Sequence, residues 1–363
     1  MIDSTNFTEP QSPRLPQLRL SVIVPARNEA ASLGACLDSL IRQSEVGFAL
    51  GEQWELLIVD DDSTDRTREI AQQAAANQPG VQVLAAPNLD LTDRGGFTGK
   101  TNACWAAAQV SDGQWLLFTD ADTVHEPGNL SRALHETQKY HAALLSYSPR
   151  QRVTGFWQRT VMPLVFSELA STYPPKKVSD PTNPLAAANG QFLMVEREAY
   201  FSVGGHRVVG REILEDVALA TAIKRARGNI RFRYAPEALS TQMYRTLPEM
   251  IEGWTKNLAL LFSSSIALVL WRMLDFILFF GLPVVALVLT SRPLWQPAVI
   301  WILWLRTLFR FYNRVSRSNF PAVDVALSIL GVPLFSWLLI RSYMHNRIHK
   351  AIAWKGRTYT GAH

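Results

Sequence analysis

Two aspartates separated by one residue, Asp120 and Asp122, carry the strongest chemical signal in this chain. Thr119 alone separates them from the apolar run Trp115–Phe118, which we interpret as a buried strand. A strand that ends in a turn can direct both carboxylates into one cleft. Two hard oxygen ligands of this kind suit Mg²⁺ or Mn²⁺, and such ions commonly bind together with phosphate. Acidic residues are also frequent in turns and helix caps, so the surrounding sequence must decide between these interpretations.

Other charged residues stand at the ends of further expected elements. The acidic cluster Asp60–Asp65 follows an apolar run, Lys100 follows a glycine-containing loop, and Glu215 and Asp216 begin a helical pattern. Carboxylates can transfer protons, and a lysine at a helix start can bind phosphate. The alternatives are that one or two of the acids cap a helix, that the acidic pair Glu215 and Asp216 is favoured by the helix dipole, and that Lys100 lies on the surface.

Alternating strands and helices must position these residues. Short apolar runs predict strands at Leu20–Pro25, Glu55–Val59, Val81–Leu84, Trp115–Phe118, Ala142–Tyr147, Asn189–Val195 and Ile230–Tyr234. Helical periodicity lies between them at Leu33–Ile41, Arg68–Ala75, Thr101–Gln109 and Asn129–Tyr140. This order predicts an α/β fold with a Rossmann-like, mostly parallel sheet flanked by helices. Ligands bind such sheets at the carboxyl ends of the strands, where the charged clusters fall.

The last third of the chain has a different composition. Asp275 and Asp324 are its only acidic residues after Glu252, and three apolar runs follow one another at Leu274–Leu289, Trp295–Leu308 and Val323–Ile340. The first and third approach the roughly 20 residues that a membrane-spanning helix needs. The formal net charge of +5 is therefore typical of a basic end at a membrane rather than of nucleic-acid binding. The alternative is that these runs are buried core helices.

The distribution of arginines makes a simple three-span topology difficult. The positive-inside rule assigns both the Arg306–Arg317 segment and the tail after Ile340 to the cytoplasm. One run is then re-entrant or interfacial, or Leu258–Leu270 is an additional one. Phe156–Tyr173 is a further apolar segment, expected to lie on the sheet or in a membrane interface. Met1–Leu18 contains no signal-peptide pattern, and the two cysteines favour a reducing compartment, so we expect the N-terminal part in the cytoplasm.

Taken in order, four motifs resemble those of family 2 glycosyltransferases with the GT-A fold: Val22–Glu29, Val59–Asp65, Asp120–Asp122 and Glu215–Asp216. The resemblance covers about residues 20–257. Supporting segments at Gly96–Lys100, Gly204–His206 and Gly253–Asn257 are similar to the membrane-bound branch that includes ceramide glucosyltransferase, hopanoid-associated and carotenoid (diaponeurosporenoate-type) glycosyltransferases. Asp62 stands where the family usually has glycine.

The resemblance implies a role for each candidate residue. Residues expected to bind the nucleotide sugar are Pro25, Glu29, Asp61, Lys100 and Asp120. Asp122, with Asp120, is expected to hold Mg²⁺ or Mn²⁺ on the pyrophosphate. Asp216 is expected to be the catalytic base of an inverting transfer, and Glu215 and Trp254 to bind the acceptor.

One departure from the family concerns the acceptor. Processive glycan synthases carry Gln-x-x-Arg-Trp, whereas only Trp254 remains in the matching stretch Met250–Trp254. We therefore expect a single transfer of a sugar, glucose being the first candidate, from a UDP-sugar to a membrane lipid such as a carotenoid, hopanoid or sphingoid. The alternatives are a processive polysaccharide synthase and an inactive nucleotide-sugar-binding membrane protein.

The expected organisation has four parts. They are a polar tail at 1–19, the GT-A domain at 20–257, transmembrane or interfacial helices at 258–343 and a basic tail at 344–363. The expected partners are the UDP-sugar, the lipid acceptor and the bilayer, without nucleic acid. The expected location is the inner (plasma) membrane, as a multi-pass protein with its catalytic domain in the cytoplasm.

Overall fold

A seven-stranded sheet forms the centre of the α/β half of the protein, residues 20–241. The structure, a computed structural model, describes residues 18–76, 78–89, 96–262, 264–348, 351–354 and 357–360. The strands follow the spatial order β3-β2-β1-β4-β8-β6-β9. Their bounds are β1 Leu20–Ala26, β2 Trp54–Asp60, β3 Val81–Ala85, β4 Trp115–Phe118, β6 Leu144–Ser148, β8 Leu193–Glu196 and β9 Ile230–Tyr234. Only β8 runs antiparallel to its neighbours, so the predicted mostly parallel sheet is confirmed.

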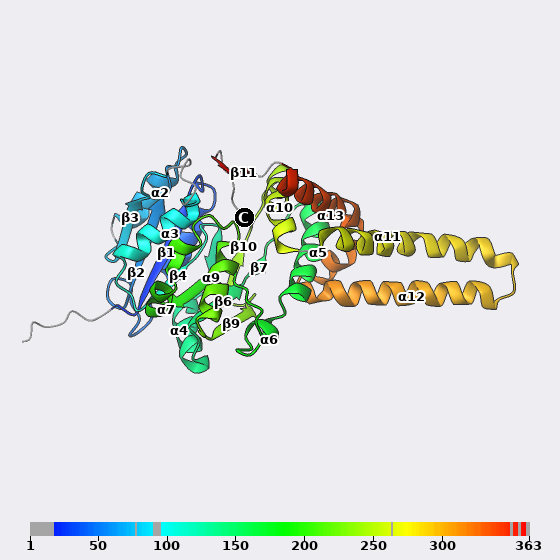
Figure 1. Cartoon of the computed structure of the whole chain (residues 1–363), viewed down its shortest axis with the longest axis horizontal. Helices are drawn as coiled ribbons and strands as arrows, with labels where there is room; N and C mark the ends of the chain where they lie inside the picture. The colour runs from blue at the N-terminus through cyan, green and yellow to red at the C-terminus, as the bar shows by residue number, and fades with distance from the viewer. Residues whose placement is uncertain are drawn as a thin grey trace, which may run out of the picture.

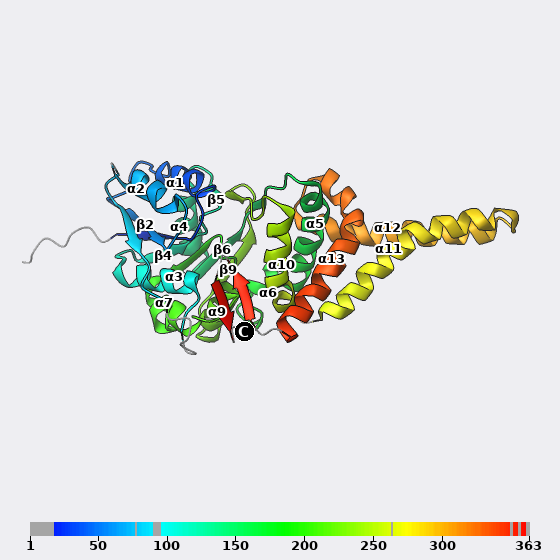
Figure 2. The same cartoon turned by 90° about the horizontal axis from the view of Figure 1, so that it is seen from above.

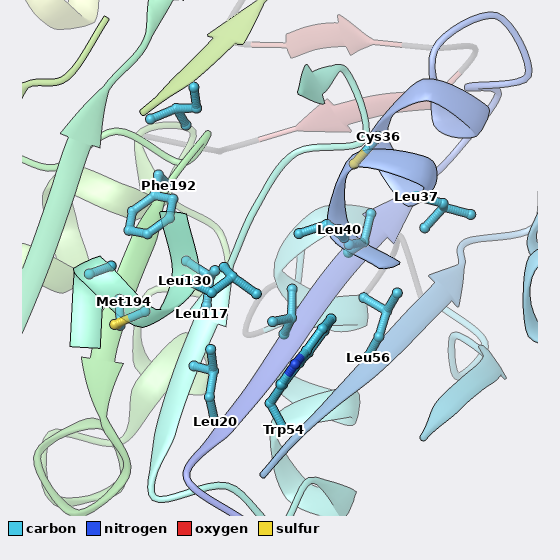
Figure 3. Close-up of a cluster of buried hydrophobic side chains, with 14 of the residues drawn as sticks. Leu20, Cys36, Leu37, Leu40, Trp54, Leu56, Leu117, Leu130, Phe192 and Met194 are labelled. Carbon is cyan, nitrogen blue, oxygen red and sulfur yellow. The ribbon is translucent and has the colours of Figure 1, made fainter. Parts of the chain in front are cut away.

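Helices cover both faces of this sheet, and each face has its own hydrophobic core. The first core joins the strands to α1 (Leu33–Ile41), α2 (Thr67–Ala75) and α4 (Asn129–Tyr140). Figure 3 shows part of it, with Leu37 and Leu40 of α1 facing Trp54 and Leu56 of β2. The second core joins the other face to α3 (Gly99–Val110), α7 (Arg197–Ser202) and α9 (Glu215–Arg225). Burial on both sides explains why the strands read as continuous apolar runs.

A small second sheet continues from the central one. It contains β5 (Thr123–His125), β10 (Leu239–Thr241) and β7 (Arg150–Gln151), with β10 in the middle. Strand β5 begins directly after Asp122, so pairing with β10 fixes the chain as it leaves the aspartate pair. The short helices α6 (Pro175–Val178) and α8 (Gly205–Val208) complete the α/β half.

Three helices form a layer beside the sheets, and two more project from it (Figures 1 and 2). The layer consists of α5 (Phe156–Thr172), α10 (Leu247–Leu261) and α13 (Ala322–Ile348). The projecting hairpin consists of α11 (Ser265–Val288) and α12 (Trp295–Val315), with the 3-10 turns Leu289–Ser291 (η1) and Ser316–Ser318 (η2) at their ends. A final pair of strands, Ala351–Trp354 (β11) and Arg357–Thr360 (β12), is antiparallel.

Two expectations for this region need correction. Helix α5 packs mainly against α13 and also against α10, so of the two alternatives for this segment the position on the sheet is wrong. Its apolar residues are buried among helices because they surround α5 and do not form one stripe. The additional run Leu258–Leu270 is also not a separate helix. It is divided between the end of α10 and the start of α11.

Within the described residues, two helices are long and apolar enough to cross a membrane. They are Ser265–Ser291 and Ala322–Asn346, judged by length and composition. Only 11% of the apolar window of the first is buried, against 50% for the second, so α11 presents most of its apolar surface outward. The second predicted run, Trp295–Leu308, is part of α12, which does not meet the same criterion.

A cluster of buried charges joins the projecting hairpin to the body of the protein. Glu168 of α5 accepts hydrogen bonds from Arg314 of α12 and lies 3.7 Å from the guanidinium of Arg272 on α11. Arg272 also pairs with Asp275 at 3.0 Å, and Asp275 accepts a further hydrogen bond from Arg310. The Glu168 and Asp275 side chains are only 4% and 1% exposed. Removing one partner from such a cluster leaves the other charges buried without compensation.

We therefore expect Glu168→Gln to lower the free energy of unfolding by about 3–5 kcal/mol, because Arg314 and Arg272 lose their common carboxylate. Denaturant unfolding of the protein in detergent micelles measures this change. The matched control is Glu69→Gln, which removes an exposed ion pair with Arg66 and should leave the unfolding midpoint unchanged. Equal effects of the two substitutions would contradict the importance assigned to the buried cluster.

Candidate active site

A cavity of about 340 Å³ lies between the carboxyl ends of the central strands and helices α5 and α10. It brings together every residue that the sequence proposed for the site. These are Pro25, Glu29, Asp61, Lys100, Asp120, Asp122, Glu215, Asp216 and Trp254. The volume falls within the range of sites for small ligands. The wall formed by the strand ends is mostly polar, and the wall formed by α5 and α10 is mostly apolar.

The loops after β1 and β2 form one end of the cavity and are held together by hydrogen bonds. Arg27 donates to the backbone carbonyls of Asp61 and Asp62 at 2.6 and 2.9 Å. The amide of Glu29 donates to the hydroxyl of Thr67 at 2.7 Å. Asp61 itself is buried, with 5% exposure. These hydrogen bonds hold the two loops together, although the loops are distant in sequence.

The acidic cluster after β2 divides between structural and cavity-lining residues. Asp65 accepts hydrogen bonds from the amide and the hydroxyl of Thr67, the first residue of α2, so at least one acid stabilises the start of that helix. Asp62 has φ of 55° in the left-handed region, where the family usually has glycine. Of these acids, Asp61 lines the cavity.

The aspartate pair lies in the turn between β4 and β5. Thr119, directly before it, donates to the carbonyl of Gln191 at 2.8 Å and contacts His125. The amide of Thr123 donates back to the carbonyl of Asp120 at 3.1 Å, closing the turn. Burial, and then the nearby Asp120 and Glu29, raises the pKa of Asp122 to about 7. The site therefore concentrates negative charge that a cation can compensate.

Lys100 bridges two acids from opposite sides of the cavity. Its ammonium lies 2.7 Å from Asp120 and 2.8 Å from Glu215. Thr98 caps the first turn of α3, which fixes the position of Lys100 in that turn. Burial alone would lower the pKa of Lys100, but Asp120 and Glu215 outweigh it and hold the pKa well above its ordinary value. Lys100 is therefore a permanent cation here.

Asp216 lies in the first turn of α9, next to Glu215. Its two carboxylate oxygens accept hydrogen bonds from the amides of Val217 and Gly190, each at 2.8 Å. The dipole interpretation is thus partly correct, since one of these bonds lies inside the helix turn. Burial, and then the charge of Glu215, raises the pKa of Asp216 to about 7. A carboxylate with this pKa is suited to exchange protons near neutral pH.

Gly190 is a site residue that the sequence did not single out. A Cβ at this position would lie 2.7 Å from the Lys100 ammonium and 3.7 Å from Asp216. The absence of a side chain therefore allows Lys100 to reach its two acids. The sequence signal is Asn189–Gly190, which alone predicts only a turn before a strand.

Lys256 of α10 is a second residue that the sequence did not assign. It lines the cavity, where Glu215, Lys100, Asp120 and Asp216 all affect its pKa. Burial, the largest influence, lowers that pKa. Lys256 belongs to the segment Gly253–Asn257, in which the family resemblance assigns a role only to Trp254.

The donor set fits a divalent cation of the hard type. Among the described residues, no three His, Cys, Asp or Glu side chains gather into a protein-only metal cage. Mg²⁺ typically binds proteins through one or two carboxylates and completes its coordination with substrate phosphates and water. The pair Asp120 and Asp122 is a donor set of that kind.

Comparison with known proteins agrees with this arrangement. Residues 21–217, more than half of the chain, match the family described as glycosyl transferase family 2. The 4,4'-diaponeurosporenoate glycosyltransferase of Staphylococcus haemolyticus is 28% identical, over 94% of this chain and 88% of the relative. The protein of the same name from Staphylococcus aureus strain USA300 is 24% identical, with the same coverage.

A solved structure shares the fold at low sequence identity. The mannosyltransferase PcManGT from Pyrobaculum calidifontis, in complex with GDP-mannose and Mn²⁺, has a TM-score of 0.51 and 17% identity. The similarity covers 92% of this chain and 89% of that one. The matched family, the relatives and the fold together show that this chain belongs to glycosyl transferase family 2 and is a glycosyltransferase.

Proposed function

We propose that this enzyme transfers a sugar, with inversion, from a UDP-sugar to a hydroxyl or carboxyl group on a membrane lipid. The expected sugar is glucose, and the expected acceptors are a carotenoid, a hopanoid or a sphingoid. The observation that carries the proposal is the composition of one cavity, in which several carboxylates and Lys100 face a mostly apolar wall of α5 and α10. A nucleotide sugar matches the charged half, and a lipid matches the apolar half.

The donor lies along the ends of β1, β2 and β4. Pro25, Glu29 and Asp61 border the base and ribose, and Asp120 faces the ribose. Lys100 is close enough to Asp120 to bind a phosphate that approaches the aspartate pair. Asp122 and Asp120 would hold Mg²⁺ or Mn²⁺, which when bound would offset the charge of the departing nucleoside diphosphate. The solved mannosyltransferase also contains Mn²⁺, which agrees with this choice of ion.

The acceptor approaches from the side of α9 and α10. Asp216 takes the proton of an acceptor hydroxyl as its oxygen attacks the anomeric carbon. The two backbone hydrogen bonds to Asp216 orient its carboxylate, while Glu215 and Trp254 position the acceptor. The staphylococcal relatives are named for 4,4'-diaponeurosporenoate, which supports an acceptor of the carotenoid class.

The proposal includes a membrane location. The apolar helices α11 and α13 support anchorage in the inner (plasma) membrane as a multi-pass protein, with the catalytic half in the cytoplasm. The rival functions make different products. A processive synthase would give a ladder of sugars, and an inactive binding protein would give none. Incubation of membranes with radiolabelled UDP-sugars, followed by lipid extraction, tests the proposal, which requires a single labelled glycolipid.

Asp216→Asn should reduce transfer to a hydroxyl acceptor by about 10²–10⁴-fold, because the amide cannot accept the proton. UDP binding, measured by calorimetry, should remain close to that of the unmodified enzyme. Asp112→Asn, on an exposed position outside the cavity, is the control. Unchanged turnover of the Asp216 variant would refute its assignment as the base.

Removal of divalent cations with EDTA should stop transfer, and added Mg²⁺ or Mn²⁺ should restore it. Asp122→Asn should raise the metal concentration needed for half-maximal activity, because one of the two carboxylates is lost. Initial rates over a metal titration measure both effects. Full activity in EDTA would contradict a role for the metal.

The pH dependence should reveal Asp216. Its pKa of about 7 means that the carboxyl becomes protonated, and therefore unable to accept a proton, as the pH falls below 7. We expect kcat/KM for a hydroxyl acceptor to fall about tenfold per pH unit well below 7, and to level off above it. Saturating metal keeps Asp122 deprotonated during the measurement. The residual rate of Asp216→Asn should lack this inflection, and an unchanged inflection would assign it to another group.

A further inference from the structure

The apolar wall of the cavity faces the acceptor side of the reaction. Phe166, Leu169 and Tyr173 of the α5 region and Trp254 and Leu261 of α10 contribute to it. Leu169, Tyr173 and Leu261 remain partly exposed in the cavity. Apolar surface that is left open to water in a binding cleft is typical of a site that a ligand covers. A nucleotide sugar consists largely of polar and charged groups, so it does not match this wall.

The wall also lies close to the start of α11, the more exposed of the two candidate spans. Leu261 is the last residue of α10, and the candidate span begins at Ser265, four positions later. A chain of four residues extends at most about 14 Å. The cavity wall and the beginning of α11 are therefore close in space as well as in sequence. An apolar chain of moderate length can reach from one to the other.

We propose that this wall is a subsite for one elongated apolar chain of the acceptor, whose oxygen nucleophile is at the chain's end. The inference rests on the proposed function and specifies the shape of its acceptor. The reactive end lies at Asp216, the first part of the chain lies along Leu169 and Leu261, and the remainder extends toward α11. Apolar residues outside these two helices, among them Ile213, Phe232 and Met243, also line the cavity. The wall of α5 and α10 differs from them in its short connection to α11.

The bonds that form and break are the same for a terminal hydroxyl and for a terminal carboxylate. A bond forms between that oxygen and the anomeric carbon, while the bond from the anomeric carbon to the phosphate oxygen breaks. The nucleoside diphosphate leaves with the electron pair. A hydroxyl gives its proton to Asp216, and a carboxylate attacks without a proton to release.

A series of primary alcohols with increasing chain length tests the subsite. The full-length protein in lipid nanodiscs is supplied with a UDP-sugar and alcohols of about two to eight carbons. We expect KM to fall with each added methylene, by up to about fourfold, until the wall is covered. A KM that does not depend on chain length would overturn the subsite.

Variants on two different helices make the test specific. Leu169→Gln and Leu261→Gln should each reduce the KM ratio of the shortest to the longest alcohol by tenfold or more, because a polar side chain then faces the chain. The matched control is Leu260→Gln, on the same helix but outside the cavity lining, which should keep the ratio. Partition of the alcohols into the bilayer is common to all variants and cancels in this comparison.

The possible outcomes separate this inference from the proposed function. If both cavity variants keep the ratio of the unmodified enzyme, the wall does not bind the chain and the subsite is refuted. If the unmodified enzyme transfers no sugar to any alcohol or extracted lipid, the proposed function fails and the subsite fails with it. A loss of chain-length dependence in both cavity variants, but not in the control, supports the subsite.

Discussion

The confinement of several carboxylates in one cavity is the constraint on which the site depends. Asp120, Asp122, Glu215 and Asp216 line the same cavity, where burial strengthens the repulsion between like charges. Lys100 relieves part of this repulsion by bridging Asp120 and Glu215. Burial and the neighbouring carboxylates raise the pKa values of Asp122 and Asp216. A site that holds excess negative charge in this way is prepared for a cation and for proton transfer.

The local features of the catalytic half could be predicted from sequence because they depend on short-range patterns. Continuous apolar runs identified the strands of a sheet buried on both faces, and charged residues after those runs identified its ligand edge. The family resemblance predicted that Asp61, Asp120 and Asp216 lie in one cavity, although more than a hundred residues separate the first from the last. Their spacing in the sequence does not by itself predict this proximity.

The features that were missed depend on contacts between distant segments. Position 190 requires glycine because a Cβ there would crowd the ammonium of Lys100, a residue distant in sequence. Helix α5 has no single apolar stripe, so its sequence did not indicate that α13 and α10 would surround it. The cluster of Glu168 with Arg272 and Arg314 joins residues more than a hundred positions apart. No periodicity in the sequence predicts such pairs.

The position of Glu168 on α5 has a consequence for the architecture as a whole. Its neighbours on the same helix, Phe166 and Leu169, line the cavity, while Glu168 itself holds the hairpin of α11 and α12. Helices α5, α10, α11, α12 and α13 also share one hydrophobic core. A chain cut after α10 would retain the catalytic residues but expose that core and leave Glu168 facing no arginine. The cavity and the helical layer are therefore joined through α5, and a substitution on this helix can affect both.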